Sequence, residues 1–407
     1  MREIADKVFW IGKVDDRKVP FHRLVLEKGT SYNAYLIRDE KTALIDTVDM
    51  LYGKEFTDNL GKEMDLLTLD FIVINHTEPD HSGALGSLIR KAQNAKVVCT
   101  AFAVYELMEM YKIDKERFLV VRTGDTLNLG TKTLSFHETP FLHTEETMVT
   151  YLEEEKMLFT CDIFSTHIAD NDRLLVSELE DEDSILEDFK VYYKLIMDPH
   201  RRYVLPMIDV VKKLDIRTIA TSHGYILDQN VEKYMGIYEE AALQSKENVK
   251  ALILYNTMSG NTKKMARILE NELTEQGFIV ESINTEKAEL EEVLTKIQYA
   301  DGILFGTSTK YADIPGNLEA ILKELKELEV EGKPAAAFGS YGWSGEAVEV
   351  VQDYLVGAGM KALRSSDVIK STGMSDISFP LRVRFNPENS TNEIKAAASV
   401  FADAIRF

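Results

Sequence analysis

The hydrophobic pattern in the first part of the chain predicts short strands that alternate with helices. Apolar or alternating runs, which are typical of strands, lie at residues 8–12, 32–37, 41–46, 69–74, 96–100, 118–121, 148–152, 156–160 and 216–221, and residues 127–136 have the pattern of a hairpin. Apolar positions with helical spacing predict helices after residue 81 to about residue 91, and at about 101–111, 183–197 and 201–214. This alternation indicates an α/β fold.

The second part of the chain has the continuous apolar runs of a buried parallel sheet. Such runs lie at residues 251–255, 302–306 and 335–338, with helices predicted at about 263–276 and 391–405. A polar joint at residues 246–250 separates the two parts. The sequence therefore predicts two domains, residues 1–247 and residues 248–407.

Polar residues directly after the apolar run 69–74 have the chemistry of metal ligands. They are His76, Glu78, Asp80 and His81. If this loop is extended, His76, Glu78 and Asp80 project to one side. A solvated polar loop is the simpler reading of any one of them, but four ligand-type side chains in six positions are dense for a plain loop.

Three further ligand candidates follow predicted strands in the same way. They are His143, Asp162 and His223. Each alone is better explained as a capping aspartate or a hydrogen-bonded histidine. Because strand ends within one sheet converge, the three together with the first cluster predict a metal site at a sheet edge.

The strand at residues 251–255 runs into a hydroxyl-rich loop that precedes a helix. The loop residues are Thr257, Met258, Ser259, Gly260, Asn261 and Thr262. Backbone N–H groups and a helix N-terminus at such a loop attract a phosphate. The chain has no GxxxxGK[ST] and no GxGxxG pattern here, which disfavours a nucleoside triphosphate and a dinucleotide.

Charge and cysteine content narrow the classes of partner. The 47 Lys and Arg residues against 68 Asp and Glu give a net charge of −21, which disfavours nucleic acid. No apolar run approaches the ~18 residues of a membrane span, and the N-terminus lacks an apolar signal core, so a cytoplasmic protein is expected. Cys99 and Cys161 are interpreted as reduced core thiols. Without a CxxC pair, no iron–sulfur cluster or rubredoxin-type iron site is expected in the chain.

The order His-x-Glu-x-Asp-His, His, Asp, His resembles the metallo-β-lactamase fold. Most hydrolases of that fold have a zinc-binding His at the position of Glu78, and the Glu is the mark of the flavodiiron proteins, or A-type flavoproteins. Mixed carboxylate and imidazole ligation suits paired non-haem iron. The loop at 257–262 resembles the FMN phosphate loop of flavodoxins. The pairing of the two halves resembles the flavodiiron layout over essentially the whole chain.

The resemblance implies an α/β protein with an N-terminal metallo-β-lactamase-like αββα sandwich and a C-terminal flavodoxin-like, doubly wound, parallel five-stranded sheet. Its cofactors would be two bridged irons and FMN. His76, Glu78 and His143 would bind one iron, and Asp80, His81 and His223 the other. Asp162 would bridge the irons, whereas the position of His81 does not ligate in every family member.

Other positions match the family by motif or more loosely. The family often has Trp where this chain has Thr144. Candidates for the substrate pocket are His22, His167 and Tyr192, and a surface or core role is an equally good alternative for each. The second and third flavin loops comprise Thr307, Ser308, Thr309, Lys310, Tyr311, Ser340, Tyr341, Gly342, Trp343, Ser344 and Gly345. Tyr311, Tyr341 and Trp343 would stack on or flank the isoalloxazine ring.

The implied function is reduction of O2 to water, of NO to N2O, or of both. FMN holds two electrons and a diferrous pair two more, which is what reduction of O2 to water needs. Electrons would come from an external donor such as rubredoxin or reduced deazaflavin. A head-to-tail homodimer, alone or as a dimer of dimers, would place the FMN of one subunit beside the irons of the other. A zinc hydrolase with an FMN-binding module and a flavodoxin-type electron shuttle are the alternatives.

Overall fold

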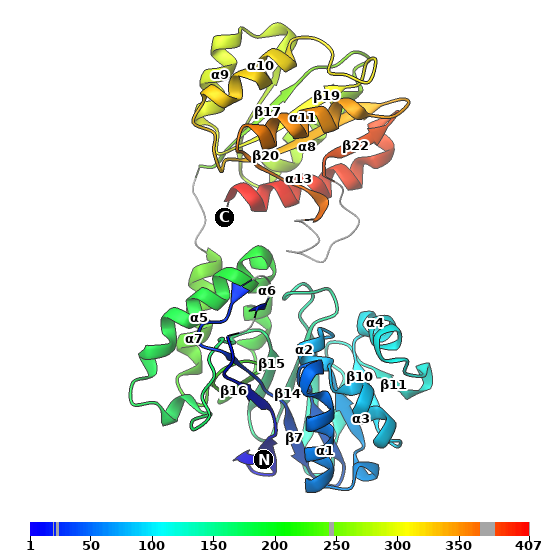
Figure 1. The fold of residues 1–407 in the computed structure, drawn as a ribbon, viewed down its shortest axis with the longest axis vertical. Coiled ribbons are helices and arrows are strands. Elements are labelled where there is room, and N and C mark those ends of the chain that lie inside the picture. Colours follow the sequence, from blue (N-terminus) through cyan, green and yellow to red (C-terminus); the bar gives the residue numbers. More distant parts are fainter. Residues whose placement is uncertain (19, 22–23, 244–247, 367–378, 407) are drawn as a thin grey trace. The chain divides into compact units, whose positions relative to one another are not determined.

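A computed structural model of the chain describes residues 1–18, 20–21, 24–243, 248–366 and 379–406 (Figure 1). The chain forms two compact units, Met1–Leu243 and Gln244–Phe407. The predicted domain boundary at residue 247 falls among residues outside the described ranges and stays a prediction. Within those ranges, no helix is both long and apolar enough to cross a membrane.

The first unit contains two large β-sheets. The first sheet has the order β1 (Arg2–Ala5), β2 (Val8–Trp10), β7 (Tyr35–Arg38), β8 (Thr42–Ile45), β9 (Phe71–Val73), β10 (Lys96–Cys99) and β11 (Phe118–Val120). The second has the order β12 (Thr126–Asn128), β13 (Thr133–Glu138), β14 (Met148–Leu152), β15 (Met157–Cys161) and β16 (Thr218–Thr221). Two short pairs, β3 (Lys13–Asp15) with β6 (Thr30–Tyr32) and β4 (Pro20–Phe21) with β5 (Leu24–Val25), complete the strands.

Helices cover the outer face of each sheet (Figure 1). The first sheet carries α1 (Gly53–Glu63), α3 (Leu85–Lys91) and α4 (Ala101–Tyr111). The second carries α5 (Leu186–Tyr192), the π-helical turn η6 (Tyr193–Met197), α6 (Arg201–Val211) and α7 (Val231–Leu243). Between the sheets, Ile37 and Val98 belong to the same buried cluster as Phe136 and Phe159. The predicted αββα sandwich is therefore confirmed.

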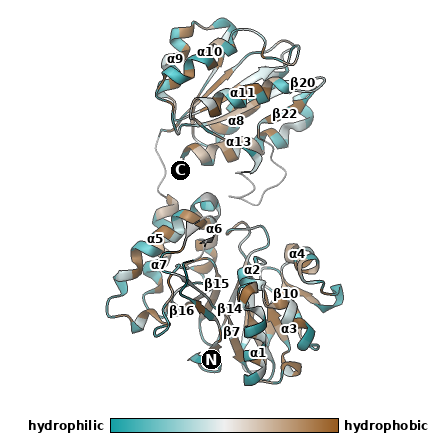
Figure 2. Cartoon of the chain, viewed as in Figure 1, coloured by the Kyte–Doolittle hydropathy of each residue, from teal (hydrophilic) through white to brown (hydrophobic). Residues whose placement is uncertain are grey.

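The second unit is a parallel sheet with helices on both faces. Its strands are β18 (Ile279–Asn284), β17 (Lys250–Tyr255), β19 (Gly302–Ser308), β20 (Pro334–Tyr341), β21 (Lys361–Ala362) and β22 (Leu381–Arg384). One face carries α8 (Asn261–Glu275) and α13 (Thr391–Arg406), and the other carries α9 (Leu290–Tyr299), α10 (Leu318–Glu324) and α11 (Glu346–Gly357). Brown, hydrophobic residues lie along the strands of both units (Figure 2).

The strand order in this unit is that of a flavodoxin-like sheet. One detail differs from five continuous strands. Strand β21 pairs with the start of β20, and β22 pairs with its end, so two short strands share the fifth position. The doubly wound parallel fold is confirmed, with its fifth strand in two pieces.

Candidate metal and flavin sites

The loop after β9 turns into a single helical turn, α2 (Pro79–Ser82), instead of staying extended. Proline favours the first helical position, and Glu78 is the residue that precedes it. The expectation that His76, Glu78 and Asp80 project to one side is therefore wrong. The turn carries Asp80 and its neighbour His81 to a second group of side chains.

Residues at the end of β8 hold this loop in place. The backbone N–H and side-chain amide of Asn75 donate to the two oxygens of Asp46 at 2.7 and 2.9 Å. Burial raises the pKa of Asp46 to about 6, although His81, Asn75 and His76 oppose the shift. The backbone N–H of Thr47 donates to the carbonyl of His81 at 2.7 Å. Both ends of the ligand-bearing segment are thus tied to the neighbouring strand.

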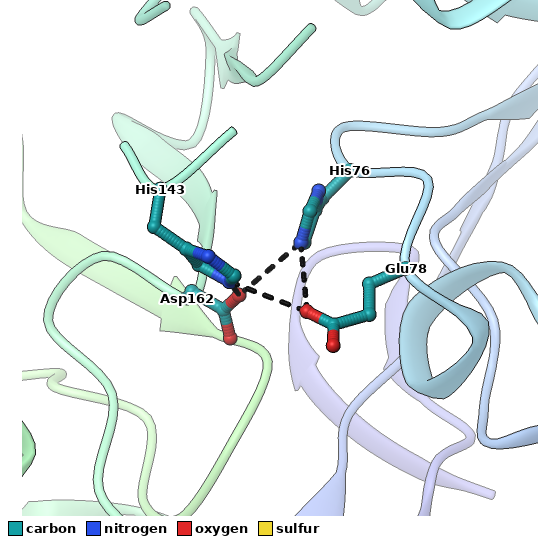
Figure 3. Close-up of side chains that lie close together, drawn as sticks. All are labelled: His76, Glu78, His143 and Asp162. Carbon is teal, nitrogen blue, oxygen red and sulfur yellow. Dashed lines mark hydrogen bonds and ion pairs between the residues drawn. The ribbon is translucent and has the colours of Figure 1, made fainter. Parts of the chain in front are cut away.

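The first ligand group brings together His76, Glu78, His143 and Asp162 (Figure 3). Their ligand atoms all lie within 4.8 Å of one another. Glu78 Oε2 is 3.2 Å from His76 Nε2 and 3.3 Å from His143 Nε2. These are two imidazoles and two carboxylates from three separate segments of the chain, aimed at one point.

The second group consists of Asp80, His81 and His223. Asp80 Oδ2 lies 3.2 Å from His81 Nε2 and 3.3 Å from His223 Nε2. All three side chains are buried.

Asp162 lies between the two groups. Its Oδ2 is 3.1 Å from His143 Nε2 and 3.6 Å from His76 Nε2. Its Oδ1 is 3.2 Å from both His81 Nε2 and His223 Nε2. One carboxylate thus presents one oxygen to each group, and the structure brings all seven sequence-derived ligand candidates together.

Two imidazoles are oriented by partners on their other ring nitrogen. His76 Nδ1 lies 2.7 Å from Glu146 Oε1, and His223 Nδ1 donates to the carbonyl of Ser31 at 2.7 Å. Glu146 also accepts from the backbone N–H and hydroxyl of Thr77. Such contacts fix the ring orientation and turn Nε2 toward the ligand groups, as metal-ligating histidines require.

The carboxylates of the site stabilise positive charge on their neighbours, whether that charge is a protonated imidazole or a metal ion. Burial lowers the pKa of His143 and His223, but carboxylate contacts dominate and raise these values to about 9 and about 10. Burial raises the pKa of Asp162, but His81, His143 and His223 together hold it well below its usual range. Without a metal, protons on the imidazoles supply this positive charge, and bound cations would replace them.

The hydrogen bonding of the ligand side chains also indicates that the site holds cations. Within the described residues, the buried Oδ1 of Asp80 makes no hydrogen bond, and Oδ2 of Asp80 and Nε2 of His81 face their neighbours as ion pairs without hydrogen-bond geometry. Leaving such atoms unsatisfied costs about 1–3 kcal/mol each. Metal coordination would satisfy them, so this donor set of four imidazoles and three carboxylates fits a pair of metal ions.

Two of the three candidates for the substrate pocket lie beside the metal groups. The Tyr192 hydroxyl donates to Asp162 Oδ1 at 2.8 Å. The ring of His167 lies 4.9 Å from that of Tyr192 and 4.9 Å from that of His223, centroid to centroid. Both residues therefore adjoin the metal groups, whereas His22 lies outside the described residues.

Sequence reasoning missed three residues near the site. Glu146 is an acidic residue close behind His143, and that proximity could have marked it. The role of Ser31 uses a backbone carbonyl, which every residue has, so no sequence pattern identifies it. His200 is buried with its ring 6.0 Å from that of His143, and burial lowers its pKa to about 3.

Thr144 also touches the site. Its hydroxyl lies 3.1 Å from His76 Nδ1. Thr144 therefore places a hydroxyl beside the same ring nitrogen that contacts Glu146.

The three predicted flavin loops meet at the carboxyl ends of β17, β19 and β20. The Thr262 hydroxyl lies 3.0 Å from that of Ser308 and 2.9 Å from that of Ser340. Gly260 precedes α8 with φ +83°, a conformation that glycine adopts without strain. One residue from each loop thus converges beside the N-terminus of a 15-residue helix, where an anion is favoured.

The side chains around this point suit a planar ligand with a phosphate. The buried hydroxyl of Thr309 makes no hydrogen bond within the ranges that the structure describes. Tyr311 and Trp343 are 92% and 91% exposed. An unsatisfied hydroxyl, a helix N-terminus and two open aromatic rings fit FMN.

Comparisons with known proteins agree with both sites. The family model described as ODP family beta lactamase matches residues 30–224, and the flavodoxin model matches residues 253–395. An anaerobic nitric oxide reductase flavorubredoxin from Klebsiella pneumoniae is 37% identical over 365 residues, which cover 88% of this chain and 75% of the relative.

Solved structures give the same result. The flavodiiron protein from Giardia intestinalis aligns with a TM-score of 0.58 at 26% identity, covering 99% of this chain and 96% of that one. The rubredoxin oxygen:oxidoreductase from Desulfovibrio gigas aligns with a TM-score of 0.58 at 28% identity, covering 99% and 98%. This chain belongs to the flavodiiron protein family, whose two cofactors, a non-haem diiron centre and FMN, are those that its two sites are built to hold.

Proposed function

We propose that this oxidoreductase reduces O2 to water, NO to N2O, or both, with electrons that reach a diiron site through FMN. The observation that carries the proposal is the position of Asp162, whose two oxygens face two ligand groups. When bound, the irons and FMN supply the electrons for reduction of the gas. The protein's part is to hold, orient and tune them.

Each ligand candidate has a role in this proposal. His76, Glu78 and His143 hold one iron, Asp80, His81 and His223 hold the other, and Asp162 bridges them. His81 is included because its Nε2 lies as near to Asp162 as that of His223 does. Tyr192 keeps its proton, because burial raises the pKa of its phenol well above the usual range, and so its hydroxyl stays a donor to Asp162.

A zinc hydrolase with an FMN-binding module is the alternative. Glu78 argues against it, because a carboxylate replaces an imidazole at a position where zinc sites of this fold have histidine. Metal and flavin analysis of anaerobically purified protein separates the two. Stoichiometric zinc, hydrolase activity and no reduction of either gas would refute the proposal.

The role of Asp162 can be tested by substitution. Asp162→Ala should lose iron or turnover while the FMN absorbance stays unchanged. Asp162→Asn should be nearly as damaging, because the negative charge of the bridge matters as well as its shape. A fully active Asp162→Ala protein would refute the bridge.

The proposed electron path needs an outside donor and a second copy of the chain. A rubredoxin fits as the donor, since one structural relative is named a rubredoxin oxygen:oxidoreductase, and reduced deazaflavin is the other candidate.

Electron transfer between FMN and iron is fast only over short separations. We infer a head-to-tail homodimer in which Tyr311 and Trp343, both highly exposed, meet the partner. A cytoplasmic location stays a prediction.

A further inference from the structure

The first unit contains a pocket of ≈ 240 Å³ beside α5 and η6. Much of its lining is apolar: Leu26, Val191, Leu195 and Ile196. Leu195 and Ile196 belong to the π-helical turn η6, which directly follows Tyr192. Such turns are uncommon and often occur at functional sites, because the extra residue displaces side chains from their regular helical positions.

Two residues that line the pocket also contact members of the metal groups. Tyr192 lines the pocket, and its hydroxyl donates to Asp162 Oδ1 at 2.8 Å. His167 also lines it, and its ring lies 4.9 Å from that of His223. Two lining residues are therefore also neighbours of the proposed iron ligands.

The outer end of the pocket is open to solvent. Val191 and Leu195 remain 53% and 44% exposed, although both are apolar. Two further lining residues, Lys28 and Asp188, form an ion pair at 2.7 Å that joins the loop before β6 to α5. The rim of the pocket is thus polar at the ion pair of Lys28 and Asp188 and apolar along η6.

We propose that this pocket is the route by which a small, apolar diatomic gas reaches the metal site. This inference rests on the proposed function and adds the path that its substrate takes. A neutral diatomic molecule loses little solvation free energy when it leaves water. An ion would lose much more, because it finds few polar partners along Leu26, Val191, Leu195 and Ile196. Engineered apolar cavities of about 150 Å³ bind xenon or benzene, so the volume here is ample for such a gas.

Xenon tests the pocket without any catalysis. Crystals of the protein with iron and FMN bound, pressurised with xenon, should show an anomalous peak between Leu195 and Tyr192. Leu195→Trp, which fills the pocket from a partly exposed position, should abolish the peak. The matched control is Glu187→Trp, which places the same side chain on α5 at a position that is 87% exposed and not part of the lining. A wild-type pocket that takes up no xenon would overturn the proposal.

The rate at which NO binds to the reduced irons tests the route itself. In stopped-flow mixing, Leu195→Trp should slow NO binding by about tenfold. The indole would fill the pocket, so NO could enter only after the side chains that line it rearrange, and association that requires a conformational change is slower. The iron and FMN contents should stay at wild-type levels, and Glu187→Trp should bind NO at the wild-type rate. A wild-type rate in a fully loaded Leu195→Trp protein would refute the route.

Failure of the proposed function would look different from failure of the route. In that case the fully loaded wild-type protein would turn over neither NO nor O2. NO binding slowed by Leu195→Trp, together with xenon in the wild-type pocket, would still support the route.

Discussion

Glu146 contacts His76 through a single carboxylate oxygen, 2.7 Å from Nδ1, and both side chains are buried. Burial raises the pKa of Glu146, but the imidazole of His76 dominates and keeps the value well below its usual range. The carboxylate therefore remains charged, fixes the ring, and makes its other nitrogen a stronger donor to a metal.

Neutralising that carboxylate should weaken iron binding without touching the flavin. We expect Glu146→Gln to lower iron affinity by about 10–100-fold, the usual effect of losing such a partner. Competition with a chelator measures it, and FMN absorbance provides the internal reference. Glu145→Gln is the matched control, because Glu145 is exposed. Equal iron affinity in Glu146→Gln and the wild type would contradict the assigned role.

Gly83 should tolerate no side chain. A Cβ at this position would lie 2.2 Å from the backbone nitrogen of Met50 and 2.2 Å from the carbonyl oxygen of Pro79. We expect Gly83→Ala to destabilise the first unit by about 1–3 kcal/mol and to displace the ligand loop, because both neighbours are backbone atoms. Thermal unfolding and iron content measure the two effects.

Gly236 in α7 is the control for this substitution, since a Cβ there would meet nothing within 4 Å. Gly236→Ala should stabilise the protein by about 0.5–1 kcal/mol through its higher helix propensity. If Gly83→Ala were as stable and as iron-rich as Gly236→Ala, the tight packing of the loop would be refuted.

Asp170 should make stability depend on acid pH. Burial raises its pKa, but hydrogen bonds from the Tyr225 hydroxyl and from the backbone N–H groups of Asp172 and Arg173 dominate and lower the value from 3.8 to about 2. Because the folded state binds this proton less readily than the unfolded state, the stabilisation is complete above pH 3.8 and is lost as the pH falls through about 2.

Asp170→Asn removes this dependence. The variant should be less stable than the wild type near neutral pH, and the difference should shrink as the pH falls below 3.8. Thermal unfolding of the metal-free protein across this range measures it, with Asp172→Asn as control because its side chain is exposed. A stability difference that stays constant with pH would show that the charge of Asp170 is not responsible.

A mixing experiment tests the cross-subunit electron path. One variant, Asp162→Ala, is disabled at the irons, and the other, with Thr257→Ala and Ser259→Ala, is disabled at the flavin loop. In a mixed dimer one intact flavin would face one intact diiron site, so activity should partly return. Confirmed subunit exchange without any activity, or a wild-type protein that is active as a monomer, would refute the head-to-tail dimer.

Much of the site could be predicted because the ligand candidates follow strands. Asp162 follows β15 and His223 follows β16, which are adjacent parallel strands, so their ends must converge. The flavin loops were predictable for the same reason, since β17, β19 and β20 are parallel neighbours. In both units, local hydrophobic runs determine the strands, and the strands place the polar residues.

Other features depended on contacts that no local pattern encodes. The helical turn α2 separates Asp80 from Glu78, although alternation in an extended loop would have kept them together. The contact between His76 and Glu146 spans 70 positions of sequence. The pocket beside Tyr192 arises from the π-helical turn η6, whose apolar residues are equally compatible with a regular α-helix.

A single-turnover reaction tests whether the protein reduces NO or O2 with electrons stored on its irons and FMN. The protein with iron and FMN bound is fully reduced without oxygen, and then mixed with NO or with O2 while FMN absorbance and gas are followed. We predict that FMN is reoxidised as N2O forms or as O2 is consumed, and that Asp162→Ala with normal FMN does neither. A fully loaded, fully reduced wild-type protein that leaves both gases unchanged would refute gas reduction by this protein.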